Sequence, residues 1–267
     1  MNIAIIYHDA DFDGRLSNEV CRHWLAHMHP DAAIQSYGWD YGRPVPTPTM
    51  LDEDEKPSFL SYDLIFIVDL SVDELMARPE LRNKIVWIDH HKSAIEKWDT
   101  KFNGADPFDR PFTGYRIDGV AACRLCWQWF FVQQLDAQDG GEGRFTVPLK
   151  QHFIDRAVSE PELLRLAGEY DIWDHRDPDA KALQFGLRAL SDTELATLIY
   201  RQFNNSGSEL DRGHAFIAIR LAVKNGHAIK SYCDRQNDEY SATYSHTIKW
   251  EGLTFCALNI GQRGNSD

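Results

Sequence analysis

The stretch NIAIIYHDADFDGRL, residues 2–16, decides the fold of this chain. Its first residues, Asn2 to Tyr7, form a short apolar run that ends in a polar turn containing Gly14. Such a run is typical of a buried parallel strand. From Arg15 to His29, apolar residues recur at helical spacing, so a helix should follow. A strand that leads through a tight turn into a helix is the basic unit of an α/β fold.

The first third of the chain repeats this unit. Further strands are predicted over Ala33 to Tyr37, Asp63 to Leu70 and Lys84 to Asp89. The last two each lead into an expected helix, with Ser71 and Ser93 as N-caps. This alternation predicts an α/β fold built on a doubly wound, mainly parallel sheet flanked by helices.

The remainder of the chain is helical and then turns to β structure. We expect helices over 119–135, 149–157, 160–169, 180–204 and 209–243, and strands over 247–250 and 253–260. The chain then divides into an α/β domain at 1–190, a helical connector at 191–245 and a β segment at 246–267. Because these last strands have little to pair with, we expect the segment to begin a small second domain that is cut short at Asp267.

Charge and composition exclude several classes of protein. The 28 Lys and Arg residues against 41 Asp and Glu give a net charge of −13. This charge disfavours non-specific binding to long DNA, but a short anionic substrate held by metal ions remains possible. No apolar run approaches the ~20 residues of a membrane helix, and five scattered cysteines indicate reduced thiols. We therefore expect a cytoplasmic protein without membrane contact, and a homodimer stays open.

Acidic residues and histidines follow three of the predicted strands. They are His8, Asp9, Asp11 and Asp13 after the first strand, Asp69 at the end of the third, and Asp89, His90 and His91 at the end of the fourth. The carboxyl ends of parallel strands line one crevice, so these side chains should converge. Carboxylates this close need a compensating cation. Carboxylate and imidazole without thiolate suit manganese, and two such ions would activate a hydroxide for in-line attack on a phosphate.

These residues are similar to motifs I to III of the DHH phosphoesterase superfamily. The matching motifs are His8-x-x-Asp11-x-Asp13-Gly14, Asp69 after an apolar strand, and Asp89-His90-His91. A fourth segment, Glu169-Tyr170-Asp171-Ile172-Trp173, resembles the Asp-Leu-Trp segment of many members. Alone, the Asp9–Asp13 segment is equally typical of a solvated turn. The four motifs together, in order, make residues 1–190 resemble a DHH-type catalytic domain.

The resemblance implies a hydrolase with two Mn²⁺ ions, for which Mg²⁺ or Co²⁺ could substitute. The implied metal ligands are His8, Asp11, Asp13, Asp69, His90 and Asp171, with Asp69 bridging the two ions and His91 contacting the scissile phosphate. Asp89 would orient the imidazole of His90, as metal-bound imidazoles generally require. Two choices stay open: Asp9 in place of His8, although His8 is preferred, and Asp174 in place of Asp171.

The family includes RecJ-like exonucleases, oligoribonucleases, cyclic-dinucleotide phosphodiesterases, and hydrolases of pyrophosphate and polyphosphate. Many members have a C-terminal Gly-Gly-Gly-His motif that this sequence lacks. That absence and the charge of −13 favour a short oligonucleotide or a (cyclic) dinucleotide as substrate. Hydrolysis of a phosphoanhydride is the alternative, although the short spacing from His8 to Asp11 counts against a pyrophosphatase. A nucleotide-binding sensor of the same fold without catalysis is a further alternative.

Overall fold

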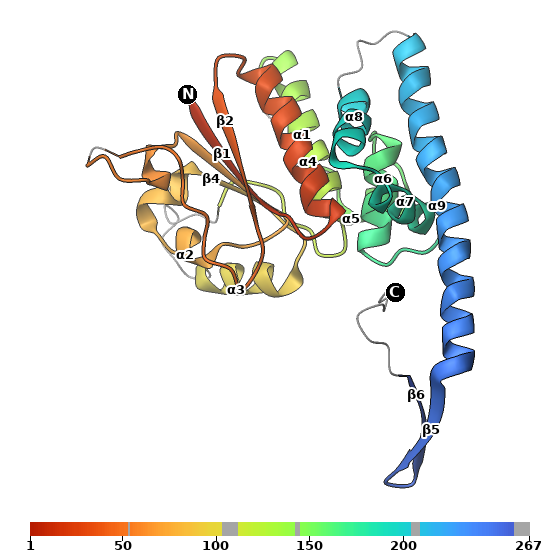
Figure 1. Cartoon of the computed structure of the whole chain (residues 1–267). Coiled ribbons are helices and arrows are strands. Elements are labelled where there is room, and N and C mark those ends of the chain that lie inside the picture. The colour runs from red at the N-terminus through yellow and green to blue at the C-terminus, as the bar shows by residue number, and fades with distance from the viewer. Residues whose placement is uncertain (53, 103–111, 142–144, 204–208, 259–267) are drawn as a thin grey trace.

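A four-stranded parallel sheet organises the N-terminal half of the protein (Figure 1). The computed structural model describes residues 1–52, 54–102, 112–141, 145–203 and 209–258. The sheet order is β2-β1-β3-β4, and the strands are β1 (Asn2–His8), β2 (Ala33–Trp39), β3 (Leu64–Val68) and β4 (Ile85–Ile88). The chain moves from β1 outward to β2, and from β3 outward in the opposite direction to β4. The sheet therefore has its topological switch point between β1 and β3, which is where ligands bind in such folds.

Helices cover both faces of this sheet. The described helices are α1 (Phe12–Met28), α2 (Asp73–Met76), α3 (Lys92–Phe102), α4 (Ala122–Gln138), α5 (Lys150–Ile154), α6 (Glu162–Asp171), α7 (Pro178–Arg188), α8 (Asp192–Phe203) and α9 (Glu209–Tyr244), with 3₁₀ turns η1 (Phe59–Ser61) and η2 (Pro79–Lys84). Within the described ranges, no helix combines the length and the apolar composition that crossing a membrane requires.

Alternating strand residues feed two separate hydrophobic cores. Ile3 and Ile5 of β1 face the larger core, which includes residues of α1 and α4. Ala4 and Ile6 point to the opposite face, where a second core includes residues of α2 and α3. Because both faces are covered, β3 and β4 are apolar throughout, and β1 is apolar from Ile3 to Tyr7. The edge strand β2 is less buried and includes Gln35 and Ser36. The expected α/β fold with a parallel sheet flanked by helices is confirmed.

The helical region predicted over 180–204 is interrupted in the structure. It forms α7 and α8, and α8 begins directly after Ser191. The Ser191 hydroxyl accepts the N–H of Glu194 at 3.4 Å, and the Glu194 carboxylate accepts the N–H of Ser191 at 2.9 Å. This reciprocal pair is a capping box, which starts a new helix. Its Ser-x-x-Glu signature was present in the sequence, and the prediction of one continuous helical stretch missed it.

Two glycines bring α9 into close contact with α7. A Cβ atom at Gly226 of α9 would lie 1.7 Å from the carbonyl oxygen of Ala182 in α7. A Cβ at Gly186 of α7 would lie 2.1 Å from the carbonyl oxygen of Ala222 in α9. A side chain at either glycine would force the helices apart, so the contact requires residues without a Cβ atom at both positions.

After α9 the chain forms an isolated hairpin of β5 (Ser245–Trp250) and β6 (Leu253–Leu258). Figure 1 shows it extending past the last turn of α9. The strands expected at 247–250 and 253–260 are thus present, although residues 259–267 lie outside the described residues. The division into units at 1–190, 191–245 and 246–267 stays a prediction.

The α7–α9 contact makes a matched pair of substitutions informative. Gly226→Ala should lower the free energy of unfolding by about 2–3 kcal/mol, because the new methyl group overlaps the α7 backbone. Gly213→Ala in the same helix meets no atom within 4 Å, and it should stabilise the helix by up to ~1 kcal/mol. Urea unfolding followed by circular dichroism measures both. Equal stability of the two variants would contradict the packing described for α7 and α9.

Candidate metal centre

The switch point of the sheet gathers acidic and imidazole side chains from five segments of the chain. They are His8 at the end of β1, Asp11 and Asp13 at the start of α1, Asp69 after β3, Asp89, His90 and His91 after β4, and Asp171 at the end of α6. The turn from β1 to α1 is tight: a Cβ at Gly14 would lie 2.0 Å from the His8 carbonyl oxygen. Glycine is therefore required at this position.

The first group in this cluster centres on His8. Its Nδ1 atom lies 3.1 Å from Oδ2 of Asp11 and 3.6 Å from Oδ2 of Asp69. The other oxygen of Asp11 accepts the N–H of Gly14 at 3.0 Å and so caps α1. Asp11 thus has one oxygen engaged in the fold and one directed at the cluster.

The second group centres on His90. Its Nε2 atom lies 3.2 Å from Oδ1 of Asp69, 3.4 Å from Oδ2 of Asp171 and 3.6 Å from Oδ2 of Asp13. Three sets of residues have ligand atoms within 4.8 Å of one another: His8, Asp11 and Asp69; Asp13, His90 and Asp171; and Asp69, His90 and His91. Asp69 turns one oxygen toward each histidine and so joins the two groups.

The backbone of Asp69 has an uncommon conformation. Its φ angle is +61°, in the left-handed region, and the residue is buried. Its N–H donates to the carbonyl oxygen of Ile88 at 2.9 Å, which holds the turn against β4. Aspartate tolerates this region better than most residues, at a cost of about 1–2 kcal/mol. Conformations of this kind concentrate at functional sites.

Burial and mutual repulsion govern the charge of this cluster. Burial raises the pKa of Asp13, Asp69 and Asp171 to about 7, and neighbouring carboxylates add to the shift. Contacts with Asp11 and Asp69 raise the pKa of His8 to about 11. Without another cation, the negative charge of the carboxylates must therefore be balanced by the His8 imidazolium and by protons bound to the carboxylates themselves.

The residues present fit a divalent cation. Nδ1 of His8 and Oδ1 of Asp69 are buried and make no hydrogen bond, although each lies close to an oppositely polar atom. Buried polar atoms without hydrogen bonds are uncommon and require an explanation, which ligation would supply. The cluster offers oxygen and imidazole nitrogen, and no thiolate belongs to its ligand sets in the described residues. That combination suits Mn²⁺ or Mg²⁺ rather than a structural zinc ion.

The structure separates the alternatives that the sequence leaves open. Asp9 pairs with Arg43, whose Nη1 lies 3.2 Å from both of its carboxylate oxygens. Asp174 pairs with Arg176 at 2.6 Å. Among the described residues, neither aspartate belongs to a metal-capable set, whereas His8 and Asp171 do.

The expected role of Asp89 is wrong in one respect. Its Oδ1 atom accepts Nδ1 of His91 at 2.7 Å and the backbone N–H of His90 at 2.7 Å. The carboxylate therefore orients the ring of His91 rather than that of His90. The reason is the turn after β4, which brings the His90 backbone, and not its ring, beside Asp89.

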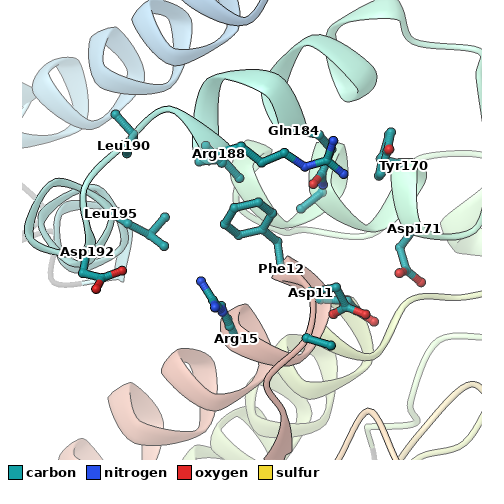
Figure 2. A pocket seen from close by; sticks show the side chains of 14 residues that line it. Asp11, Phe12, Arg15, Tyr170, Asp171, Gln184, Arg188, Leu190, Asp192 and Leu195 are labelled. Carbon is teal, nitrogen blue, oxygen red and sulfur yellow. The ribbon is translucent and has the colours of Figure 1, made fainter. Parts of the chain in front are cut away.

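Sequence reasoning missed Asp40. Its Oδ1 atom lies 3.2 Å from Nε2 of His8, so it holds the ring edge that points away from Asp11. Asp40 directly follows β2 at the same sheet edge, and that position was the available signal. Several residues beside the cluster had no such signal: Arg15, Gln184 and Arg188 line an adjoining pocket without belonging to any motif (Figure 2).

Replacing one buried carboxylate tests the cluster. Asp171→Asn should raise the free energy of unfolding of the metal-free protein by about 1 kcal/mol at pH 8, because it removes a repelling charge. Since the folded-state pKa of Asp171 is raised to about 7, this gain should shrink as the pH falls from 7 toward 4. Mn²⁺ at ~100 times its Kd should stabilise the wild type by about 2.7 kcal/mol, and the variant by much less.

Asp174→Asn is the matched control for this measurement. The residue lies three positions from Asp171, outside the cluster, so Mn²⁺ should stabilise this variant as it does the wild type. Thermal melts of the three proteins with and without Mn²⁺ give the comparison. Equal stabilisation of the wild type and Asp171→Asn would contradict the site.

A functional conclusion for this chain rests on the geometry of the site, because comparisons with known proteins found no match. The chain matches no family model, no curated protein and no solved structure.

Proposed function

We propose that this chain is a DHH-type, metal-dependent phosphoesterase that hydrolyses a phosphodiester bond in a short oligonucleotide or a linear or cyclic dinucleotide. The observation that carries the proposal is the pair of three-residue groups joined by Asp69 at the switch point of the sheet. Two adjacent groups of this composition match the requirements of two divalent cations. Mn²⁺ suits the mixed carboxylate and imidazole ligands best, and Mg²⁺ or Co²⁺ could replace it.

The cations, when bound, would supply an activated water molecule and neutralise charge on the phosphate. His8, Asp11, Asp13, Asp69, His90 and Asp171 would hold them. The remaining task for the protein is to bind and orient the phosphate, because a phosphodiester carries its own negative charge into a carboxylate-rich site.

His91 is suited to that task. Its Nδ1 atom is engaged by Asp89, and its side chain is 39% exposed, which leaves the Nε2 edge for a ligand. The hydrogen bond to Asp89 raises the pKa of His91 to about 9. The ring is then an imidazolium at neutral pH, and it can donate from Nε2 to a phosphate oxygen.

Removing the central imidazole tests the proposal. His90→Ala should lower kcat/KM for phosphodiester hydrolysis with Mn²⁺ by at least ~100-fold. The reason is that the substitution removes one of the side chains that would hold the cations, the imidazole that lies beside three carboxylates of the cluster. The substrates are a linear dinucleotide, a cyclic dinucleotide, a longer single strand and pyrophosphate, with EDTA as the metal-free reference. His27→Ala, an exposed histidine near the end of α1, should behave as the wild type.

Each outcome of this panel has a definite meaning. Cleavage of a nucleotide substrate that depends on Mn²⁺ and His90 supports the proposal. Cleavage of pyrophosphate alone replaces it with a phosphoanhydride hydrolase. Absence of cleavage overturns the enzymatic proposal, and nucleotide binding without turnover would then favour a sensor of the same fold.

A further inference from the structure

The turn that follows β2 lies against one group of the metal cluster. It comprises residues 40–43, and the N–H of Arg43 donates to the carbonyl oxygen of Asp40 at 3.3 Å. Gly42, the third residue of the turn, has a φ angle of +83°, which glycine adopts without strain. The indole N–H of Trp39, the buried last residue of β2, donates to the carbonyl oxygen of Arg43 at 3.1 Å. These bonds fix the turn at the carboxyl edge of the sheet.

Asp40 directs one carboxylate oxygen at an imidazole of the cluster. Its Oδ1 atom accepts the backbone N–H of Tyr41 at 2.8 Å and lies 3.2 Å from Nε2 of His8. An ionised carboxylate has no hydrogen to donate, so Nε2 is the donor in this second bond. The other oxygen, Oδ2, lies 3.8 Å from Nη2 of Arg43, whose Nη1 atom contacts Asp9. The carboxylate is therefore anchored on its own turn.

This hydrogen bond decides which nitrogen of His8 is left for a cation. While Nε2 is engaged by Asp40, Nδ1 lies 3.1 Å from Oδ2 of Asp11 and 3.6 Å from Oδ2 of Asp69. Nδ1 is buried and makes no hydrogen bond. A metal-bound imidazole generally donates its other N–H to a carboxylate or a carbonyl, which fixes the ring and makes the ligating nitrogen more basic. Asp40 meets that requirement for His8.

Tyr41 attaches the same turn to the loop after β3. Its hydroxyl oxygen accepts the N–H of Ser71 at 3.0 Å, two residues after Asp69. The centre of its ring lies 6.3 Å from that of His8 and 5.3 Å from that of Trp39. Adjacent residues of one turn therefore contact both His8 and the loop that carries Asp69.

The second group of the cluster is held by other elements. Asp13 accepts the N–H of Ala122 at the start of α4, and Asp171 lies at the end of α6. In the part of the chain that the structure describes, no hydrogen bond or ion pair joins Asp40 to Asp13, His90 or Asp171. Loss of the Asp40 carboxylate should therefore affect one group and spare the other.

We infer that Asp40 is a positioning residue for one of the two cations. Its carboxylate holds the ring of His8 so that Nδ1 is turned toward the space shared with Asp11 and Asp69, and it has no such role for the cation of the His90 group. The inference rests on the proposed function, because it takes the pair of cations from that proposal.

Mn²⁺ binding to the full chain tests the inference independently of activity. Electron paramagnetic resonance measures the free Mn²⁺ during a titration, and calorimetry gives the affinity of each site. The wild type should bind two ions. In Asp40→Ala, one affinity should fall about 10- to 100-fold and the other should stay within about twofold of the wild-type value.

Two further variants separate positioning from a general effect of charge. Asp40→Asn keeps an oxygen that can accept Nε2–H of His8, so it should recover most of the lost affinity. Asp31→Ala removes the same charge from an exposed residue just before the opposite end of β2, and it should bind both ions as the wild type does. The Asp40 side chain is 32% exposed, so its truncation should leave the fold intact, and circular dichroism melts without metal verify this.

The Mn²⁺ dependence of hydrolysis connects Asp40 to the proposed reaction. In Asp40→Ala, the Mn²⁺ concentration that gives half-maximal cleavage of a dinucleotide should rise about 10-fold or more. Asp31→Ala should follow the wild-type curve.

Each result has one meaning. Selective loss of one ion in Asp40→Ala, reversed in Asp40→Asn, supports the inference. Unchanged binding of both ions, equal weakening of both, or a selective loss that Asp40→Asn does not reverse overturns it, and the proposed function stands if the wild type cleaves a dinucleotide. Selective and reversible loss in a protein that cleaves no phosphodiester supports the role of Asp40 and overturns the proposed function. A wild type that binds fewer than two ions overturns both.

Discussion

The carboxylate of Asp13 forms the interaction on which most of the site depends. It accepts the backbone N–H of Ala122 at 2.7 Å and of Cys123 at 2.8 Å. These are the first residues of α4, whose own N-cap, Ala121, has no capping side chain. One buried charge therefore joins the start of α1 to the start of α4, where the helix dipole favours an anion. The same carboxylate faces His90, so the fold and the candidate chemistry share one group.

The order of the strands imposes the second constraint. Because β1 and β3 are neighbours, the turns that follow them meet at one edge, and Asp69 falls between His8 and His90. A left-handed backbone at Asp69 turns the side chain into this space. The result is a concentration of buried carboxylates that are unstable as an ionised set without a cation. The topology thus creates an electrostatic problem that divalent cations would resolve.

The helical half completes the site from the other side. Glu169 of α6 is fully buried and accepts Arg156 at 2.8 Å and Arg165 at 3.0 Å. A buried charge paired this way is held firmly in one geometry, and removing one partner would be strongly destabilising. Asp171 follows two residues later, so the ion pairs position it opposite His90. The helices α6, α7 and α8 also form the walls of the adjoining pocket.

The sequence by itself determined the strands, the parallel sheet and the edge at which the acidic residues gather. It could do so because buried parallel strands require continuous apolar runs. Once the end of each strand is known, the residues that follow it at the carboxyl edge of the sheet are known as well. The four motifs also indicated which side chains to expect in the cluster. Helix boundaries were predicted less well, because the capping box at Ser191 divides a stretch that helical periodicity treats as continuous.

Only the tertiary structure decided which of these groups contact one another. That Asp89 holds His91, that Asp9 is occupied by Arg43, and that Asp40 reaches His8 all depend on how turns distant in the chain meet. The pocket is a stronger case, since Arg15 of α1 and Gln184 of α7 are 169 residues apart in sequence and neither lies in a motif. The local sequence pattern determines which residues are buried and which backbone conformation they adopt. Which side chains touch depends on how distant elements pack against one another, and a local pattern contains no information on that.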